Sequence, residues 1–191
     1  MLFTLAEIES SRAGKIGMEV GSLRERIIVA LLIAAFGKEN VETNIPITKA
    51  EVDVKVYNKP LSIKTKTGKS LSGVKIAWTV DSSKAREFIE NYQPLCDLIF
   101  VQIIWNEMGG FYYISTETQK ELLETIGFKE YFKLPKQGTN PRGVEISKMA
   151  LAELLKAKET EKIEIFWEKK KINYDPYKKW INYWLEPVFQ I

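Results

Sequence analysis

Val, Leu and Ile alternate with polar residues on both sides of residues 57–60 in the stretch from Ala50 to Gly68. This period of two predicts a pair of β-strands, because successive side chains of a strand point to opposite faces of a sheet. We expect residues 57–60 to link the two strands. One face then carries Val52, Val54, Val56, Leu61 and Ile63 towards a core, and the other carries Glu51, Asp53, Lys55, Ser62, Lys64 and Lys66.

A four-residue link also predicts the register of this hairpin, since the link determines which residues stand opposite each other. The expected pairs are Val56 with Leu61, Asp53 with Lys64, and Glu51 with Lys66. Acid–lysine pairs of this kind are common on solvent-exposed hairpins and contribute only about 0.2–1 kcal/mol each. A carboxylate facing a lysine can also hold a divalent metal beside a phosphate, as in a nuclease. The alternation alone leaves both interpretations open.

A long helix is predicted before the hairpin, from Glu19 to Phe36, because apolar residues recur there three or four positions apart. Gly37 follows as a helix C-cap. Glu25 lies in the charged middle of this helix between two arginines, so the pattern alone indicates a solvated or salt-bridged carboxylate. Residues 2–12 form a shorter predicted helix, and residues 10–17 form a loop that contains two glycines.

The remainder of the chain alternates between strand and helix patterns. A nearly continuous apolar run at 97–105 predicts a central strand buried on both faces, and Gly109-Gly110 predicts a turn after it. Further expected strands are at 41–47, 74–80, 111–115 and 162–167, and further helices end at 92 or span 116–126 and 144–158. With no repeat and no long linker, we expect one domain over residues 1–191: an α/β protein whose central mixed sheet is flanked by helices.

The segment 168–191 is basic and aromatic. Trp180, Tyr183 and Trp184 share one face of a predicted helix there. Aromatic residues at helical spacing indicate packing in a core or in a dimer rather than stacking on nucleic-acid bases.

The composition limits the class of protein. The length of 191 residues suits one folded domain, which buries roughly 70% of the surface of its unfolded chain, and 45% apolar and 12% aromatic residues fit a globular core. A net charge of +3 provides no general attraction to nucleic acid, so a DNA-binding surface must be local. We find neither a signal peptide nor an apolar run that could span a bilayer, and therefore expect a cytoplasmic protein without a membrane partner.

Two residue counts exclude several classes of enzyme. The sequence contains no histidine, which excludes Ser-His-Asp and Cys-His hydrolases and nucleases with histidine metal ligands. It contains one cysteine, Cys96, which excludes an internal disulfide and a cysteine zinc cluster. Cys96 stands at the start of an apolar strand, where we expect a buried structural thiol. A nucleotide-binding P-loop at 63–70 is excluded because position 63 is Ile instead of Gly.

The spacing of Asp53 and Lys64 resembles that of the PD-(D/E)xK nuclease superfamily, in which an Asp and a (D/E)xK strand form a metal site. Ser62 stands where that motif has Asp or Glu, and Glu25 on the preceding helix offers the missing acid. Together with Met18 before the helix, these residues closely resemble the ThaI family of type II restriction endonucleases. The order helix, hairpin, strand, helix, strand also resembles the core of this superfamily, which implies a PD-(D/E)xK restriction-endonuclease-like fold.

The resemblance extends over residues 15–68 in spaced motifs and, by length and element order, over the whole chain. It implies an enzyme that hydrolyses double-stranded DNA at the palindrome CG/CG, leaves blunt ends and depends on Mg²⁺. Because a palindrome presents the same sequence on both strands, it also implies a twofold homodimer in which each subunit cuts one strand.

The resemblance implies the roles of the site residues as well. Glu25, Asp53 and Lys64 are expected to be catalytic, and Mg²⁺ is expected to be held by Asp53, Glu25 and the backbone carbonyl of Ile63. Mg²⁺ keeps several waters and needs few protein ligands. Lys64 would orient the attacking water or stabilise the phosphate in the transition state. If Glu25 points away, Glu51 is the alternative acid.

Met18 is the main candidate for reading the DNA. A methionine before a helix commonly packs that helix onto the core, but a flexible apolar side chain also suits a wedge between base pairs. We expect it to enter a CG step, because pyrimidine–purine steps unstack most readily. The other residues expected to contact DNA are Ser10, Ser11, Arg12, Lys15, Lys66, Lys69, Asn140 and Arg142.

Two alternative functions remain open on the sequence. One is a non-catalytic nucleic-acid-binding protein whose acid–lysine pairs only connect adjacent strands. The other is a structure-selective nuclease of the same fold. Cleavage that requires Mg²⁺ separates the first from an enzyme, and defined fragments from linear duplex separate the second from a restriction endonuclease.

Overall fold

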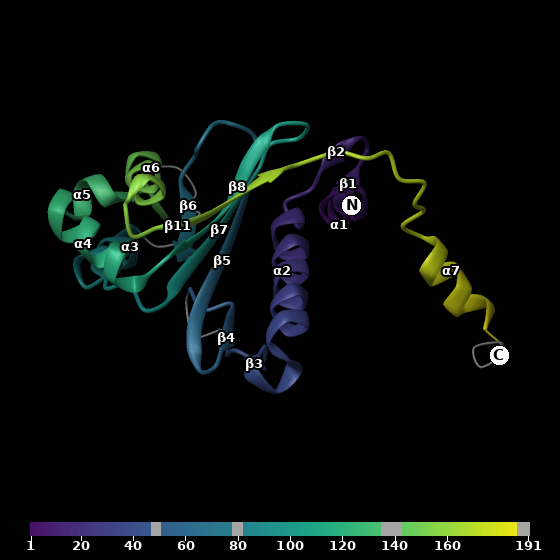
Figure 1. The fold of residues 1–191 in the computed structure, drawn as a ribbon, viewed down its shortest axis with the longest axis horizontal. Coiled ribbons are helices and arrows are strands. Elements are labelled where there is room, and N and C mark those ends of the chain that lie inside the picture. The colour runs from purple at the N-terminus through teal and green to yellow at the C-terminus, as the bar shows by residue number, and fades with distance from the viewer. Residues whose placement is uncertain (47–50, 78–81, 135–142, 187–191) are drawn as a thin grey trace.

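A six-stranded mixed sheet forms the centre of the computed structural model, which describes residues 1–46, 51–77, 82–134 and 143–186 (Figure 1). The strand order is β11-β8-β7-β5-β4-β3, and β5 and β7 are parallel while the other neighbours are antiparallel. The strands are β3 (Val41–Glu42), β4 (Val54–Val56), β5 (Lys59–Thr67), β7 (Asp97–Ile103), β8 (Met108–Ile114) and β11 (Glu161–Phe166). The mixed central sheet expected from the sequence is confirmed.

One face of the sheet is covered by the long helix α2 (Val20–Phe36), against which the N-terminal helix α1 (Leu2–Ser10) packs (Figure 1). Ile28 and Leu32 of α2 are buried in a cluster with apolar residues of β4, β5 and β7. Burial of such a side chain contributes roughly 1.5–3 kcal/mol relative to exposure in water. The predicted helix at 19–36 is confirmed, and it is followed by a short 3₁₀ turn at Lys38–Asn40.

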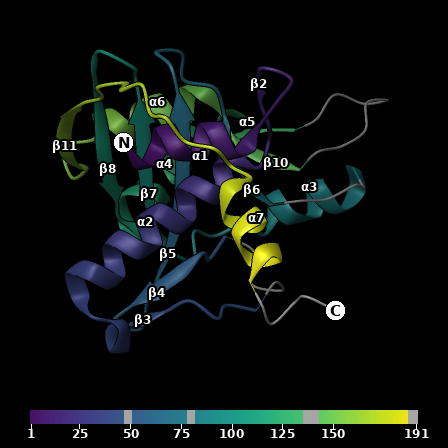
Figure 2. The same cartoon turned by 90° about the vertical axis from the view of Figure 1, so that its right-hand side faces the viewer.

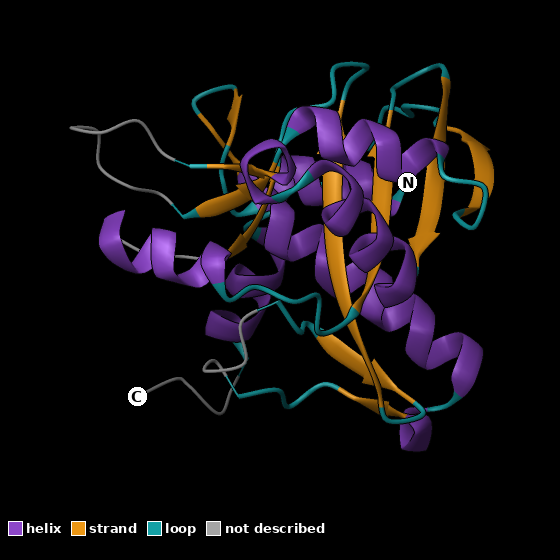
Figure 3. Cartoon of the chain, turned by 90° about the vertical axis from the view of Figure 1, so that its left-hand side faces the viewer, coloured by secondary structure: helices purple, strands orange, loops and turns teal. Residues whose placement is uncertain are grey.

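The opposite face is covered by several shorter elements (Figure 3). Phe100 of β7 and Ile114 of β8 are fully buried there against Tyr131 and Leu151. The neighbours β7 and β8 therefore contribute to both cores, and the central strand predicted at 97–105 is confirmed. The covering elements are α3 (Ser82–Glu90), α4 (Thr116–Ile126), α5 (Phe128–Tyr131), α6 (Lys148–Lys156) and a second sheet ordered β6 (Val74–Ala77), β10 (Val144–Ile146), β9 (Phe132–Lys133).

The hairpin β4–β5 has the predicted faces but not the predicted register. The ladder pairs Val54 with Leu61 and Val56 with Lys59, whereas we expected Val56 to face Leu61. The link is shorter than expected, because residues 57 and 58 alone make the turn, with φ of 48° and 65°. Two consecutive positive φ values are typical of the type I′ turn that closes two-residue hairpins. A shift of two residues is even, so every side chain keeps its face.

Two expected elements differ in their pairing or type. β6 pairs with β10 in the second sheet, so it is not a strand of the central sheet. The first residues of the helix predicted at 144–158 form the strand β10 instead, and the helix α6 starts only at Lys148. The Ser147 hydroxyl caps α6 by accepting a hydrogen bond from the Ala150 amide. The apolar alternation of Val144–Ile146 is too short to distinguish a strand from a helical turn.

The two glycines expected to form a turn lie inside β8. The chain turns earlier, at Asn106, which has a φ of 62°, and the Glu107 amide donates to the Ile104 carbonyl at 3.0 Å. A Cβ on Gly109 would lie 2.3 Å from the carbonyl oxygen of Gln102 on β7. Glycine is therefore required here for close approach of two strands.

Residues 11–16, expected as a loop, form a short β-ribbon. β1 (Ser11–Arg12) pairs with β2 (Lys15–Ile16) through a turn at Ala13 and Gly14, which both have positive φ. The ribbon connects α1 to α2 and lies beside α1 in Figure 1, and the residues of both its strands are exposed. It therefore presents its side chains to solvent.

The chain ends in an arm that carries the helix α7 (Lys178–Leu185) away from the sheet and its covering helices (Figures 1 and 2). No residue of α7 is buried. Core packing, one of the two interpretations of its aromatic face, is therefore wrong for this chain. Among the described residues, no helix is both long and apolar enough to cross a membrane.

Candidate active site

An ion pair just before β4 joins two of the residues expected to be catalytic. Asp53 Oδ2 lies 2.8 Å from Lys64 Nζ, and the two side chains are 18% and 21% exposed. The same oxygen accepts hydrogen bonds from the Ile63 amide at 2.6 Å and from the Ser62 hydroxyl at 3.3 Å. Three donors of β5 therefore hold one oxygen of the Asp53 carboxylate.

The ladder explains how Asp53 reaches Lys64 without standing opposite it. The Asp53 amide donates to the Leu61 carbonyl at 2.9 Å, and Leu61 is also the ladder partner of Val54, so two residues of this strand stand opposite one, as in a β-bulge. The Asp53 side chain lies on the face of β5 that carries Ser62. Lys64 is the next residue on the same face of β5. Such diagonal neighbours lie within reach of a long side chain. The expected contact between Asp53 and Lys64 is therefore present despite the shifted register.

Glu25 extends from α2 into the electrostatic range of this pair. Burial and the negative charge of Asp53 raise the pKa of the Glu25 carboxyl, while Lys64 and Arg26 act in the opposite direction. Among the described residues, no hydrogen bond or ion pair joins Glu25 to Asp53 or Lys64. The helix thus brings a second carboxylate towards the pair without neutralising it directly, and its role as a metal ligand stays a prediction.

Glu51 is held beside the pair by a tyrosine. The Tyr92 hydroxyl donates to Glu51 Oε2 at 3.0 Å, and the Cys96 thiol lies 3.7 Å from the Glu51 carbonyl oxygen. Glu51 has a φ of +76°, a conformation that residues other than glycine rarely adopt, so it lies outside the ladder. The expected pairing of Glu51 with Lys66 is therefore wrong. Strained backbone of this kind is often found at functional sites.

The surroundings of Glu51 favour its neutral form. Burial raises the pKa of the Glu51 carboxyl to about 7, and Asp53 adds to this shift, whereas the Tyr92 hydrogen bond and the charge of Lys64 oppose it. The same burial raises the pKa of the Cys96 thiol to about 12. Cys96 is 3% exposed, which confirms the expected buried thiol. The Glu51 carboxyl therefore gains or loses its proton near neutral pH.

The oxygen donors of the site fit magnesium. Mg²⁺ prefers oxygen ligands and keeps several of its waters, so two carboxylates and a backbone carbonyl suffice. The described residues donate hydrogen bonds to the Asp53 carboxylate only at Oδ2, so Oδ1 has no donor among them. In the same part of the chain, no three His, Cys, Asp or Glu side chains are grouped closely enough to form a metal centre on their own. Asp53, Glu25 and the carbonyl of Ile63 are the residues that would hold the ion.

Met18 lies in the short connection between the ribbon and α2, and its side chain is 89% exposed. This excludes the alternative in which Met18 packs α2 onto the core. Ile16 at the end of the ribbon is also 48% exposed. The protein therefore presents two apolar side chains to solvent close together along the chain.

The polar residues expected to contact DNA near Met18 differ in their availability. Arg12 and Lys15 are exposed on the ribbon, and Arg12 lies 3.8 Å from Glu19 in a solvent-exposed pair. Ser11 is exposed, and its hydroxyl donates to the Glu7 carbonyl. Ser10 is buried, and its hydroxyl is directed to the same carbonyl. This geometry therefore favours Arg12 and Lys15 as the residues that contact phosphate.

The remaining expected DNA contacts lie further along the chain. Lys66 is half-buried on β5, and Lys69 is 69% exposed in a surface ion pair with Glu107. A surface pair of this kind contributes about 0–1 kcal/mol, so a phosphate can replace Glu107 at little cost. Asn140 and Arg142 lie outside the described residues.

The sequence pattern did not identify Tyr92 as part of the site. Tyr92 and Glu51 are separated by 41 positions, and no periodicity connects the end of a helix to the beginning of a hairpin. A cavity of about 1080 Å³ opens between these two elements, with Glu51, Tyr92, Phe88 and Lys55 in its wall. The cavity gives the Glu51 carboxylate an approach from solvent, whereas Asp53, Lys64 and Glu25 do not line it.

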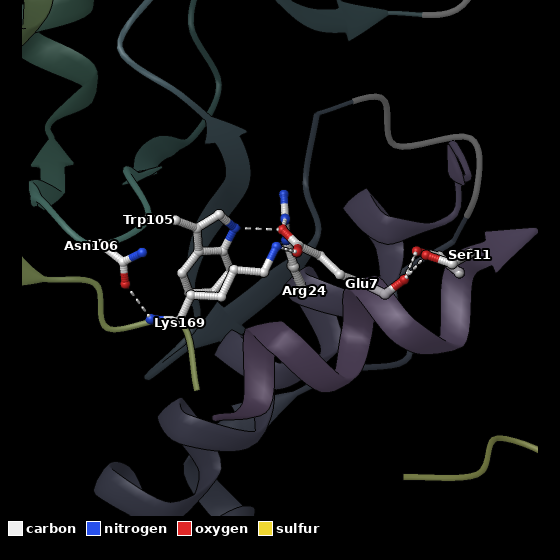
Figure 4. Close-up of polar contacts among 7 residues, drawn as sticks. Glu7, Ser11, Arg24, Trp105, Asn106 and Lys169 are labelled. Atoms are coloured by element: carbon white, nitrogen blue, oxygen red, sulfur yellow. Dashed lines mark hydrogen bonds and ion pairs between the residues drawn. The ribbon is translucent and has the colours of Figure 1, made fainter. Parts of the chain in front are cut away.

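A buried ionic cluster next to α2 was also not foreseen (Figure 4). Glu7 of α1 accepts the Arg24 guanidinium at 2.7 Å and the Trp105 indole N–H at 2.8 Å, and its other oxygen accepts Lys169 Nζ at 2.9 Å. Glu7 and Arg24 are only 4% and 3% exposed. The cluster joins α1, α2, the β7–β8 turn and the start of the C-terminal arm. Since Arg24 precedes Glu25, it also fixes the segment of α2 that carries the expected catalytic acid.

Comparison with known proteins agrees with this geometry. A family model described as Restriction endonuclease ThaI matches residues 1–186. A solved structure described as a restriction endonuclease in complex with substrate DNA is 56% identical in sequence, with a TM-score of 0.89, and the match covers 96% of this chain and 88% of that one. No curated protein sequence matches the chain. The fold and the family resemblance expected from the sequence are therefore both confirmed: the chain has the restriction-endonuclease fold and belongs to the ThaI restriction endonuclease family.

Proposed function

We propose that this nuclease is a Mg²⁺-dependent type II restriction endonuclease that cuts double-stranded DNA at the palindrome CG/CG and leaves blunt ends. We further propose that residues 1–191 form one nuclease domain that acts as a homodimer. The observation that carries the proposal is the Asp53–Lys64 pair, partly exposed at 18% and 21% beside the carboxylates of Glu25 and Glu51. The related solved protein, described as bound to substrate DNA, supports DNA as the substrate.

The residues of the pair have separate roles in this proposal. Asp53 and Glu25, with the Ile63 carbonyl, form the oxygen-rich site for the cation. When bound there, Mg²⁺ supplies positive charge beside the scissile phosphate and a water of lowered pKa. Lys64 lies against Asp53 in the free protein, and it would turn to donate to a non-bridging phosphate oxygen or to the attacking water. A donor placed where negative charge develops stabilises the transition state more than the ground state.

Glu25 is preferred to Glu51 as the second acid. Glu51 already accepts a hydrogen bond from Tyr92, and its raised pKa keeps part of the population protonated near pH 7. A ligand carboxylate must be ionised to hold the cation. No hydrogen bond or ion pair from a described residue occupies Glu25. Glu51 remains the alternative if the helix acid proves dispensable.

DNA recognition is proposed to combine one apolar and several basic contacts. Met18 would enter a CG step, and Arg12 and Lys15 would neutralise neighbouring phosphates from the ribbon. Lys66 and Lys69 would do so from the other side of the site. The CGCG sequence offers two CG steps, one for each subunit of a dimer. Contacts by Asn140 and Arg142 stay predictions.

Digestion of a plasmid of known sequence tests this function. With Mg²⁺, the proposal predicts fragments whose ends map to CGCG sites with blunt termini, and EDTA should abolish them. A gel shift without any cleavage would favour a non-catalytic DNA-binding protein. Cleavage of branched DNA, with linear duplex left intact, would favour a structure-selective nuclease. Fragments that map to another sequence would contradict the proposed CG/CG site alone.

A further inference from the structure

The helix α7 presents an apolar stripe that the chain itself leaves uncovered. Tyr177, Trp180, Ile181 and Trp184 follow the spacing i, i+3, i+4, i+7 of one helix face. They are 70%, 60%, 50% and 75% exposed, and Leu185 beside them is 68% exposed. An isolated helix of eight residues is marginal in water, because initiation of a helix is unfavourable. The helix therefore needs a packing partner for this stripe.

The beginning of the arm, unlike α7, is firmly attached to the body. The Lys169 side chain binds Glu7 in the buried cluster, and its amide donates to Asn106 Oδ1 at 3.1 Å (Figure 4). Further along, the Tyr174 hydroxyl donates to Glu9 Oε1 at 2.5 Å. Beyond Tyr174, no hydrogen bond, ion pair or ring contact connects the described part of the arm to the body. The attachment sets the direction of the arm and leaves α7 projecting from it.

A matching apolar groove lies between α1 and α2. It has a volume of about 360 Å³ and is lined by Leu2 and Leu5 of α1 and by Leu23 and Ile27 of α2. Its wall also contains one acid and one base, Glu9 and Arg26. Figures 1 and 2 show α7 on the α1–α2 side of the molecule but standing away from it. The two helices that form the groove are therefore the ones on whose side α7 stands.

We propose that two copies of this chain exchange their C-terminal arms, so that α7 of one subunit packs into the α1–α2 groove of the other. The exchange deepens the homodimer of the proposed function and rests on it. A twofold interface requires that the donated and the accepting surface lie on one side of the subunit, as α7 and the groove do. Each subunit then covers the apolar stripe of its partner.

Charge and size both favour a second copy as the occupant. Lys178 and Lys179 stand at the start of α7 and Glu186 directly after it, opposite in sign to Glu9 and Arg26 of the groove. Aromatic side chains bury roughly 150–250 Å² each. The four tryptophans of two exchanged arms therefore bury roughly 600–1,000 Å², and the other apolar side chains of the stripe add to this area, so the total reaches the roughly 1,000 Å² that a specific interface needs. A phosphate backbone would be held by basic residues and not by this apolar stripe.

Cysteine cross-linking of the full chain tests the exchange. We would prepare Leu5→Cys in the groove and Trp184→Cys in α7 as separate proteins, mix them, and oxidise them mildly. The native Cys96 is buried and does not compete. The expected product on a non-reducing gel is a disulfide-linked pair, at twice the 22.0 kDa of one chain, in the mixture only. Linked pairs from Trp184→Cys alone would place two α7 helices side by side and overturn the groove assignment.

A variant with both substitutions in one chain separates exchange from folding back. Linked dimers, or linked chains of higher order, support exchange between copies. A disulfide within one chain, visible as a faster monomer band, would show that α7 occupies its own groove and would overturn the proposal. Absence of any disulfide in both the mixture and the double variant would also overturn it.

Sedimentation of the full chain provides a second readout. Trp180→Ala/Trp184→Ala should weaken dimerisation at least 100-fold and leave the melting temperature of the monomer unchanged, since both tryptophans are exposed. Ile163→Ala is the matched control, because Ile163 is 65% exposed on the edge strand β11. Equal dimer affinities of the tryptophan variant and the control would overturn the proposal.

The two proposals fail in different experiments. A dimeric parent protein that leaves DNA intact with Mg²⁺ contradicts the proposed function and leaves the arm exchange standing. A monomeric parent protein that cuts both strands contradicts the exchange and leaves the cleavage site standing.

Discussion

Truncation of Met18 separates a role in DNA recognition from a role in folding. The side chain is 89% exposed in the free protein, so Met18→Ala removes almost no buried surface. Exposed substitutions of this kind change the free energy of unfolding by about 0.5 kcal/mol or less. For a chain of this length that corresponds to a change in melting temperature of roughly 2 °C at most.

The effect on DNA binding should be much larger. If Met18 enters a base step, the surface that is exposed in the free protein becomes buried in the complex. Burial of a methionine side chain contributes about 1.5–3 kcal/mol, which is roughly a 10- to 150-fold change in Kd per subunit. A dimer that inserts two methionines should lose about twice this free energy. The loss should apply to CGCG and not to DNA without CG steps.

Fluorescence anisotropy in the absence of divalent metal measures this binding without cleavage. The probe is a duplex with one CGCG site, and the competitor is a duplex of equal base composition without a CG step. Met149→Ala is the control, because Met149 is 40% exposed on α6, which covers the opposite face of the sheet from α2. A Met18→Ala protein that melts several degrees earlier yet binds CGCG normally would refute the wedge.

Three further predictions concern the acidic residues Glu25, Glu7 and Glu51. Glu25→Gln should reduce Mg²⁺-dependent cleavage more than Glu51→Gln does, and the opposite ranking in a metal titration would move the second ligand to Glu51. Glu7→Gln should lower the free energy of unfolding by about 3–5 kcal/mol, because it leaves the buried Arg24 guanidinium without its counter-charge. Denaturant unfolding measures this loss. The double variant Glu7→Leu/Arg24→Leu should recover most of it, because it leaves no unpaired buried charge. Because the pKa of Glu51 is raised to about 7, its ionisation destabilises the metal-free fold as the pH rises from about 4.5 through 7. In EDTA, Glu51→Gln should therefore be more stable than the parent at pH 8, by at most about 3 kcal/mol, with no gain at pH 4.5.

The parts of the site that follow from local periodicity could be predicted from the sequence. The alternation at 52–64 places Asp53 and Lys64 on one face of the hairpin, and this holds in either register because an even shift preserves the faces. The register itself was missed because Tyr57-Asn58 lacks the Asn-Gly or Asp-Gly signal of a type I′ turn. A pattern of alternation therefore specifies a face more reliably than it specifies a partner.

Contacts between distant segments had no local signal. Tyr92 reaches Glu51 across 41 positions, and Lys169 reaches Glu7 across 162 positions. Both depend on how helices and loops pack onto the sheet, which hydrophobic spacing does not encode. Whether the Met18 side chain is buried or exposed could not be predicted for the same reason, since a methionine before a helix packs inward or outward according to the tertiary fold.

The cleavage rate of variants at the Asp53–Lys64 pair tests the central claim most directly. Single-turnover cleavage of a CGCG duplex with saturating Mg²⁺ should slow at least 1,000-fold in Asp53→Asn and in Lys64→Ala, a rise in the barrier of about 4 kcal/mol. Lys55→Ala is the matched control: Lys55 lies on the same hairpin, but its ammonium group pairs with Glu42 at 2.7 Å and not with Asp53. We predict that the control cuts at the parental rate and that all three variants melt within a few degrees of the parent. Cleavage by Asp53→Asn or Lys64→Ala within tenfold of the parental rate would contradict the assignment of this site.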